Sequence, residues 1–441
     1  MSTSHEVSPA TLRRVIAASA VGNFVEWFDF AVYGFLATLI ASQFFASSDP
    51  GAGLLKTFAV FAVAFALRPL GGIVFGALGD RIGRKRVLSM TILLMAGSTT
   101  LIGLLPTYAS IGIAAPLLLT LARCLQGFSA GGEYAGACAY LMEHAPQNKR
   151  AFYGSFVPVS TFSAFACAAV IAYALEANLS SDAMNSWGWR VPFLIAAPLG
   201  LVGLHLRWRM EETPAFRAAI AEGKVHSHSP LKQTLRNHGR AIRNLGAFIS
   251  LTALSFYMFT TYFATYLQLV GNLTRAQSLL VTTVALLFAA AGCPLAGLLS
   301  DRIGRRKTIG FTCLWVMIAV FPAYWLASSG SMSGALLGVI LLAVGALMSG
   351  VVTAALLSES FPTRTRYTAS AITYNVAYTL FGGTAPLVAT WLIGQTGSSL
   401  APAFYLVVIA LLSLIGGLAL PETSRVSLHD EVPTGQPNPA V

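Results

Sequence analysis

A short charged segment occurs twice in this chain, and it restricts the possible folds more than any other feature. Residues 76–86 read GALGDRIGRKR, and residues 297–307 read GLLSDRIGRRK. Both copies stand where one long apolar segment ends and the next begins. A repeated charged loop between apolar segments indicates two homologous halves, each containing membrane-spanning helices.

The composition also indicates a membrane protein. Of the 441 residues, 55% are hydrophobic and only 10% are charged, whereas a soluble domain carries roughly 25% charged residues. Because so few charges cannot cover a surface in water, we expect lipid to surround most of the chain. A helix needs about 20 apolar residues to cross the hydrocarbon. About twelve spans are predicted, at 15–43, 54–79, 87–105, 111–142, 153–178, 188–208, 244–270, 277–300, 308–328, 332–358, 368–395 and 401–420.

The net charge of +11 is distributed unevenly about these spans. Lys56, Arg190 and Arg275 fall on one side, Arg68 and Arg123 fall inside spans, and all other Lys and Arg fall on the side of the N-terminus. This asymmetry follows the positive-inside rule. It predicts that both termini are cytoplasmic, and it removes the reason to expect nucleic acid as a partner.

A second repeated loop supports the division into halves. Residues 143–150 (EHAPQNKR) and 359–366 (ESFPTRTR) share the pattern E-x2-P-x3-R, each after the fourth span of its half. We therefore predict a six-helix bundle over 1–208, a cytoplasmic central loop over 209–243, a second six-helix bundle over 244–421 and a short cytoplasmic tail over 422–441.

No catalytic or metal-binding pattern stands out. The five cysteines lie in or beside spans without CxxC spacing, and the seven histidines form no HExxH pair. The chain contains no G-x4-G-K-S/T loop for nucleotide phosphates. We expect neither an enzyme nor an ATP-driven pump, with no metal site and no cofactor.

The repeated segment resembles the signature of the major facilitator superfamily between helices 2 and 3, with its copy between helices 8 and 9. The chain is also similar to the metabolite:proton symporter branch of that superfamily at 22–30 (GNFVEWFDF), 68–72 (RPLGG), 126–134 (QGFSAGGEY), 187–193 (WGWRVPF) and 211–216 (EETPAF). Stretches 102–119 and 187–216 most resemble proline/glycine-betaine proton symporters. The resemblance implies an all-α membrane fold of two pseudo-symmetric six-helix bundles.

Two carboxylates in the first span are candidates for proton coupling. Glu26 and Asp29 are three residues apart and so share a helical face with Tyr33. Two nearby carboxylates repel when both are ionised, so one should hold a proton more tightly. The alternative is a structural pairing or the cap of a water-filled mouth. The resemblance to other symporters implies that Asp29 pairs with Arg123 of the fourth span, where Arg123 is either a coupling partner or purely structural.

Arg68 and Glu133 are the remaining charges within predicted spans. Pro69 follows Arg68 and removes a helix hydrogen bond, so Arg68 could anchor a substrate carboxylate. The alternative is a buried ion pair with Glu26 or Glu133. Glu133 lies two residues after Gly131, at which another helix or the substrate could approach closely. Three roles are open for Glu133: a second proton site, a contact for a cationic ammonium group or a structural hydrogen-bond partner.

These charges bear on the substrate. Three acids against two arginines nearly balance, which suits a zwitterion better than a tricarboxylate. Aromatic faces attract alkylated ammonium groups, although most aromatic residues in membrane helices serve packing. The predicted substrate-binding residues are Arg68, Arg123, Trp27, Tyr33, Tyr134, Tyr262, Tyr374 and Asn375; Phe28, Tyr257, Tyr266 and Tyr378 also lie on spans that could line a cavity.

The resemblance gives the repeated loops a gating role, holding the halves together in the outward-facing state. Anchoring by positive charge alone would explain their Arg and Lys but not the repeated Asp and Gly. The predicted gating residues are Asp80, Arg81, Arg84, Glu143, Arg150, Asp301, Arg302, Arg305, Glu359 and Arg366.

Together these features predict a secondary transporter in the inner membrane of a bacterium, functional as a monomer, with the lipid bilayer and a small-molecule substrate as its partners and a proton as its coupling ion. The expected substrate is a zwitterion such as proline or glycine betaine. The alternatives are an organic acid such as 2-oxoglutarate, citrate or shikimate, and, more remotely, a membrane osmosensor. Some relatives carry a C-terminal coiled coil tied to osmosensing, whereas the tail after Pro421 shows no heptads.

Overall fold

The computed structural model describes residues 9–45, 49–82, 84–131, 133–208, 231–362 and 366–426, and every regular element in these ranges is helical. The elements are α1 (Pro9–Phe35), α2 (Ala37–Phe44), α3 (Pro50–Ala66), α4 (Arg68–Ile82), α5 (Arg84–Leu104), α6 (Tyr108–Ile111), α7 (Ala114–Ser129), α8 (Glu133–His144), η1 (Gln147–Lys149), α9 (Arg150–Gly154), α10 (Phe156–Asn178), α11 (Ser181–Ser186), η2 (Gly188–Arg190), α12 (Val191–Trp208), α14 (Leu231–Tyr257), η3 (Met258–Tyr262), α15 (Phe263–Leu269), α16 (Arg275–Ile303), α17 (Arg305–Ala327), α18 (Met332–Glu359), α19 (Arg366–Ala377), η4 (Tyr378–Gly382), α20 (Ala385–Thr396) and α21 (Ala401–Leu418).

Long apolar helices dominate the described part of the chain. Nine segments are long and apolar enough to cross a membrane: Val15–Phe35, Gly51–Phe75, Gln147–Asn178, His238–Leu269, Arg275–Ile303, Arg305–Ala327, Met332–Glu359, Thr368–Thr396 and Ala401–Leu418. Helices α5, α7 with α8, and α12 occupy the other three predicted spans. The prediction of an all-α membrane fold is therefore confirmed. Helix α14 begins at Leu231, within the predicted central loop, of which 209–230 lie outside the described residues.

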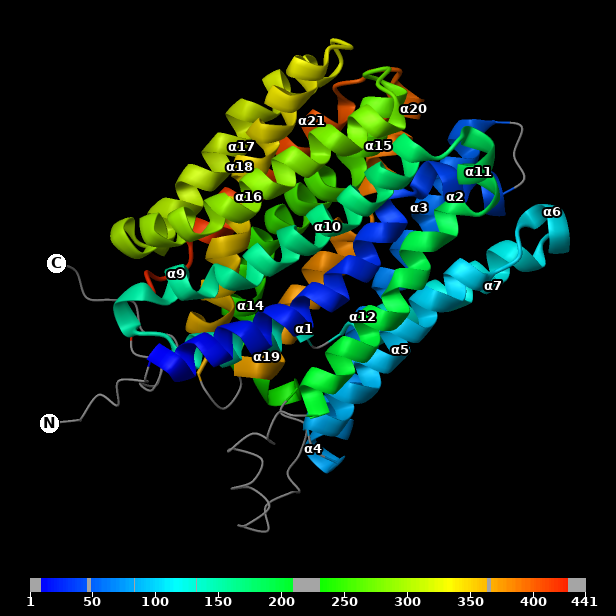
Figure 1. The fold of residues 1–441 in the computed structure, drawn as a ribbon. Coiled ribbons are helices and arrows are strands. Elements are labelled where there is room, and N and C mark those ends of the chain that lie inside the picture. The colour runs from blue at the N-terminus through cyan, green and yellow to red at the C-terminus, as the bar shows by residue number, and fades with distance from the viewer. Residues whose placement is uncertain are drawn as a thin grey trace, which may run out of the picture.

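The two halves pack against each other on two sides. Helix α10 of the first half lies along α16 of the second, and both run side by side across the molecule (Figure 1). On another side, α3 and α4 of the first half contact η4, α19 and α20 of the second. Each half thus covers a long apolar face of the other, and the centre of this contact is closed to solvent.

Helix starts and turns follow from local chemistry. Thr274 and Gln277 form a reciprocal capping box at the start of α16, and the Asp49 side chain accepts from the Gly51 amide at the start of α3. Between α16 and α17 the chain turns at Gly304, whose φ is +91°. Because side chains rarely adopt this conformation, the turn explains the glycine at this place in the repeated segment.

Glycines bring the backbones of α3 and α4 against α7. A Cβ on Gly127 would lie 1.7 Å from the Ala64 carbonyl oxygen, and one on Gly71 would lie 1.7 Å from that of Phe128. A Cβ on Gly131 would lie 2.3 Å from the carbonyl oxygen of Arg68. The predicted close approach at Gly131 is confirmed, and it places the start of α4 beside the end of α7.

Four interruptions of helical geometry surround the centre. Helix α3 ends before Leu67 and α4 begins at Arg68, so the predicted break beside Pro69 is present, and α7 ends at Ser129 before α8 begins. In the second half, η3 and η4 are π-helical turns. Such wide turns and broken helices occur where membrane transporters bind their substrates.

We call the two ends of the bundle the repeat end and the opposite end. The repeat end carries Asp301, Arg305 and Glu359, together with the second copy of the repeated segment. The opposite end carries Glu176 at the end of α10 and Arg275 at the start of α16.

Candidate functional site

Four buried charged side chains meet in the middle of the first half. Glu26 and Asp29 come from α1, Arg68 from the start of α4, and Arg123 from α7. Their exposed fractions are 5%, 1%, 0% and 0%, respectively. Two carboxylates and two guanidinium groups are formally neutral together, and so much buried charge is rare unless the site has a function.

Arg68 is paired with Glu26, but incompletely. Its Nη2 lies 3.3 Å from Glu26 Oε1 and donates to the Ala130 carbonyl oxygen at 3.2 Å. Its Nε and Nη1 have no hydrogen-bond partner among the described residues. Of the alternatives open for Arg68, this closed structure shows the ion pair with Glu26, and it leaves two donor nitrogens available to a ligand.

Aromatic rings enclose the Arg68 guanidinium. Its central carbon lies 5.8 Å from the ring centroid of Trp27, 5.4 Å from that of Phe30 and 5.2 Å from that of Phe65. These distances are within the range of cation–π attraction. The centre of the molecule therefore already holds a cation against aromatic faces.

The expected ion pair between Asp29 and Arg123 does not form in this structure. Arg123 Nη1 instead donates to Gln126 Oε1 at 2.6 Å, and the guanidinium lies 4.1 Å from the ring centroid of Tyr33. Gln126 in turn donates to the Thr99 hydroxyl. Gln126, three residues along the same helix, and the Tyr33 ring hold the guanidinium instead, while Asp29 and Arg123 act on each other only as nearby charges.

Asp29 is the least satisfied of the four charged groups. Both of its carboxylate oxygens are buried without a hydrogen-bond partner in the described ranges. The polar groups that act on it are the Thr99 side chain and the Arg123 guanidinium. A buried carboxylate without donors is stable only when protonated or when a nearby cation offsets its charge.

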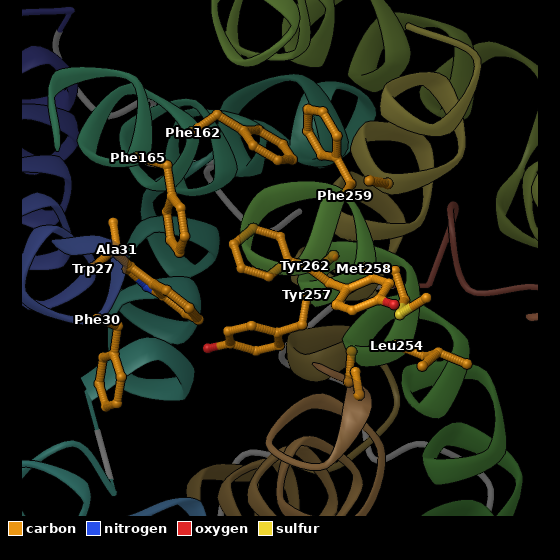
Figure 2. Close-up of a cluster of buried hydrophobic side chains, with 14 of the residues drawn as sticks. Trp27, Phe30, Ala31, Phe162, Phe165, Leu254, Tyr257, Met258, Phe259 and Tyr262 are labelled. Atoms are coloured by element: carbon orange, nitrogen blue, oxygen red, sulfur yellow. The ribbon is translucent and has the colours of Figure 1, made fainter. Parts of the chain in front are cut away.

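The second half completes the centre with tyrosines. Tyr374 stacks between Tyr134 and Tyr378, with ring centroids 4.6 and 4.0 Å away. Figure 2 shows Tyr257 extending from α14 toward Trp27 of the first half. The buried Tyr257 hydroxyl has no hydrogen-bond partner in the described part of the chain.

Asn375 of α19 links the halves beside Arg68. Its Nδ2 donates to the carbonyl oxygen of Gly131, at the end of α7, and its buried Oδ1 has no partner among the described residues. The Asn375 acceptor, the Tyr257 hydroxyl and two nitrogens of Arg68 are therefore among the buried polar groups of the closed centre that have no partner in the described ranges. Such groups are costly unless a ligand or water binds them.

Two other predicted residues lie around this centre. Tyr33 donates from its hydroxyl to the carbonyl oxygen of Thr57 at 2.9 Å, besides stacking on Arg123. Tyr262 belongs to η3, and its ring contacts those of Phe58 and Tyr266 at 6.3 Å. The side chain of Glu133 lies outside the described residues.

At the repeat end, Asp301 joins the two halves. Its carboxylate oxygens accept from the backbone amides of Ala151 at 3.0 Å and Phe152 at 2.9 Å. These amides open α9 of the first half, where a negative charge is favourable. Asp301 thus holds the N-terminal turn of a helix from the other half.

Glu359 and Arg305 form the central pair of the repeat end. Arg305 donates to Glu359 through Nε at 3.0 Å and Nη2 at 2.9 Å, and through Nη1 to Asp301 at 3.0 Å. Glu359 also lies 3.8 Å from Arg150 of the first half. All of these groups are buried or nearly so, and their charges are matched.

Comparison with known proteins identifies the family. The model of the Major Facilitator Superfamily matches residues 19–386. The chain belongs to that superfamily. Over 435 residues, it is 37% identical to the glycine betaine/proline/ectoine/pipecolic acid transporter OusA of Dickeya dadantii and 36% identical to the proline/betaine transporter of Salmonella typhimurium. Both alignments cover 97% of this chain and 87% of the relative.

Solved structures confirm the superfamily fold. The proton:xylose symporter XylE bound to 6-bromo-6-deoxy-D-glucose superposes with a TM-score of 0.75, covering 96% of this chain and 98% of that one at 18% identity. An inward-open structure of the xylose transporter XylE from E. coli gives a TM-score of 0.69 over 95% and 98%. The chain is therefore a multi-pass membrane transporter of small molecules and not an enzyme.

In this superfamily member, the segment after α21 adds contacts at the repeat end that the sequence did not suggest. Glu422 accepts from the backbone amides of Arg305 at 2.9 Å and Arg306 at 3.1 Å, and so caps α17. The Thr423 hydroxyl donates to Glu359 at 2.7 Å. Partial burial raises the pKa of Glu422, but the backbone donors of Arg305, Ser424 and Arg306 outweigh it and hold that pKa below its usual value.

The same segment reaches the first half. Arg150 Nη1 donates to the Val426 carbonyl oxygen at 2.6 Å, and the Gln147 side chain donates to that of Arg425 at 3.1 Å. The only sign of this arrangement in the sequence was a glutamate, Glu422, shortly after the last predicted span. Residues 422–426 therefore bridge both halves across the repeat end.

The other predicted gating residues lie elsewhere at this end or cannot be placed. Arg366 donates from Nε to the Phe361 carbonyl oxygen at 3.3 Å, within the second half. Arg302 is exposed to solvent. The side chains of Asp80, Arg81, Arg84 and Glu143 lie outside the described residues.

Closure of the opposite end is looser. Arg275 lies 3.6 Å from Glu176, and these side chains are 34% and 20% exposed. The Thr38 hydroxyl donates to Gln268 at 3.4 Å. A partly exposed ion pair contributes about 0–1 kcal/mol, so the packing of apolar side chains accounts for most of the closure there.

Proposed function

We propose that this transporter carries a small zwitterionic solute, such as proline or glycine betaine, together with a proton into a bacterial cell. The observation that carries the proposal is the balance of charge among the described residues of the buried centre, where Glu26 and Asp29 face Arg68 and Arg123. A zwitterion adds no net charge beyond that of the coupled proton, whereas a di- or tricarboxylate would add buried negative charge that one proton does not offset. The relatives named for proline, betaine and ectoine support the same class of solute.

In this proposal, Arg68 binds the substrate carboxylate. Its Nε and Nη1 lack partners in the described structure and point to a missing acceptor. The rings of Trp27, Tyr134 and Tyr374 and the polar ends of Tyr257 and Asn375 form the remaining walls. Tyr262 packs against Phe58 and Tyr266, and its ring contacts among the described residues do not include these walls.

Asp29 is the proposed site of the coupled proton. Its buried carboxylate has no hydrogen-bond partner in the part of the chain that the structure describes, so binding a proton removes an unfavourable charge. Arg123, held by Gln126 and Tyr33, would sense that charge from nearby and link proton binding to the substrate site. Glu26 and Glu133 are the other candidate carboxylates.

The two ends then act as alternating gates. We place the repeat end and both termini on the cytoplasmic side because most Lys and Arg outside the spans lie there. Because groups from both halves of one chain build the site, a monomer suffices for transport. The coupling ion is a proton, and the proposal requires no bound cofactor.

Uptake measurements test the function. The chain is expressed in bacterial cells that lack their own osmolyte and dicarboxylate uptake, and entry of labelled proline, glycine betaine, 2-oxoglutarate and shikimate is measured with and without a protonophore. We expect proline or betaine uptake that the protonophore abolishes. Uptake of 2-oxoglutarate or shikimate without proline or betaine would contradict the zwitterion, and uptake indifferent to the protonophore would contradict proton coupling.

The Asp29→Asn variant tests the proton site. We expect it to lose accumulation against a gradient while it still exchanges labelled for unlabelled solute, because exchange needs no net proton movement. Asp182→Asn, an exposed acid in α11, is the matched control and should accumulate normally. Full accumulation by Asp29→Asn would refute this assignment.

A further inference from the structure

The Arg68–Glu26 pair is weaker than the chemically identical pair at the repeat end. Arg305 holds Glu359 through two hydrogen bonds of 3.0 and 2.9 Å, whereas Arg68 holds Glu26 through a single contact of 3.3 Å. Both arginines are fully buried. A buried guanidinium that forms only one long bond to its carboxylate can be bound more favourably by another carboxylate.

The atom used in that contact is the decisive one. A guanidinium can hold a carboxylate with two bonds only along its Nε–Nη2 edge or its Nη1–Nη2 edge, so Nη2 belongs to both. In Arg68, Nη2 is occupied by Glu26 and by the Ala130 carbonyl oxygen. Nε and Nη1, which have no partner among the described residues, can therefore each form one of these edges together with Nη2 once Glu26 moves away.

We propose that Arg68 and Glu26 exchange partners with the substrate: the substrate carboxylate takes Arg68, and Glu26 turns to the cationic nitrogen. The proposal rests on the proposed function and assigns the two ends of the zwitterion to two residues. Before and after the exchange, each charge has a partner of opposite sign. Buried charge remains compensated throughout, which a low-dielectric site requires.

The surroundings of the pair favour this exchange. The rings of Trp27, Phe30 and Phe65 already face the Arg68 cation at 5.2 to 5.8 Å. The same type of face attracts an alkylated ammonium group. In the empty transporter, Glu26 thus takes the place of the substrate carboxylate, and the centre can close without leaving Arg68 alone.

The test compares glycine betaine with 3,3-dimethylbutanoate, which has the same shape and carboxylate but a neutral carbon in place of the cationic nitrogen. Binding to the purified full-length protein is measured by calorimetry. In the unaltered protein the carbon analogue takes Arg68 from Glu26 without offering Glu26 a cation in exchange, so we expect it to bind about 30-fold more weakly or worse, as the loss of one partner of a buried charge pair costs. Equal binding of the two ligands would overturn the exchange.

Substitution of Glu26 sharpens the result. In Glu26→Gln there is no carboxylate for the analogue to separate from Arg68, so the preference for betaine over the analogue should fall about tenfold or more. Glu26→Asp keeps the charge and should retain the preference, and Asp182→Asn controls for loss of an acid elsewhere. If Glu26→Gln does not fold, the comparison of the two ligands on the unaltered protein decides alone.

The outcomes separate the two proposals. Betaine binding with an unchanged preference in Glu26→Gln means that the exchange is wrong while the proposed function stands. If the unaltered protein binds neither betaine nor proline, the proposed function is wrong and the exchange falls with it. A reduced preference in Glu26→Gln, retained in Glu26→Asp, supports both.

Discussion

Two buried arginine–glutamate pairs in this transporter have the same chemistry but differ in how many of their polar atoms are hydrogen-bonded. At the repeat end, Arg305 and Glu359 make two short bonds to each other, and neighbouring groups bind their remaining atoms. In the centre, Arg68 and Glu26 share one long contact, and two nitrogens of Arg68 have no partner among the described residues. The difference separates a pair that holds the structure from a pair that is available to a ligand.

Burial alone would not distinguish these pairs, since both arginines are fully buried. What distinguishes them is the count of unbound donors, because an unsatisfied buried group gains free energy from any ligand that binds it. A satisfied pair gains nothing from a ligand and instead resists being pulled apart. The repeat end therefore behaves as a gate and the centre as a binding site.

The largest effect is expected for Glu359→Gln. Removing this charge leaves Arg305 buried without its main partner, which costs about 3–5 kcal/mol for a buried pair. We expect either a lower melting temperature in detergent or a repeat end that opens without substrate. Distances between spin labels on the two halves at the repeat end distinguish these two results from no change.

The control is Glu176→Gln at the opposite end, which removes a partly exposed ion pair. We expect less than about 1 kcal/mol there. Equal effects of the two substitutions would mean that the contrast in burial and bonding has no energetic consequence.

The next effect concerns the backbone beneath the central pair. In Gly131→Ala the new Cβ would lie 2.3 Å from the Arg68 carbonyl oxygen, so α4 or α7 must move, at a cost of about 1–3 kcal/mol. Because this shift displaces Arg68, substrate affinity measured by calorimetry should fall. Gly97→Ala, with no atom within 4 Å of the added Cβ, should leave it unchanged, and a loss in both variants would contradict the specific role of Gly131.

Much of the architecture could be predicted from the sequence because long apolar segments and a repeated loop are strong local signals. The pairing of Glu359 with basic residues of the repeat end followed from the position of its loop. Which charges pair in the centre could not be predicted, because it depends on the rotation and depth of each helix. Gln126, one turn after Arg123, replaces Asp29 as its partner.

Other features had almost no sequence signal. Nothing in 258–262 predicts a π-helical turn. The capping of α17 by Glu422 joins segments distant along the chain. Contacts of this kind depend on the assembled bundle rather than on local preference.

A smaller effect is expected for Asp301→Asn. The variant keeps an acceptor but loses the negative charge at the start of α9, which is worth about 1–2 kcal/mol when the charge is partly buried. Accessibility of a cysteine placed in α9 to a water-soluble thiol reagent should increase. An unchanged reaction rate would show that Asp301 does not hold the gate.

The smallest effect is the pH dependence of Glu422. Its pKa lies below the usual value of 4.5, so its contribution to capping α17 is complete at neutral pH and is lost as pH falls through that lowered pKa. A charge at a helix start contributes about 0.3–1 kcal/mol. Unfolding of Glu422→Gln should therefore match that of the unaltered protein at low pH and begin at lower denaturant concentration at pH 7; the same difference at both pH values would contradict this role.

The contrast between the two pairs is tested most directly by replacing each arginine with lysine, which keeps the charge but cannot hold a carboxylate with two bonds. Betaine affinity and melting temperature are measured for Arg68→Lys and Arg305→Lys side by side. We predict that Arg68→Lys loses about 30-fold or more in affinity with little change in melting temperature, whereas Arg305→Lys loses stability and keeps its affinity. Normal betaine binding by Arg68→Lys would contradict the account.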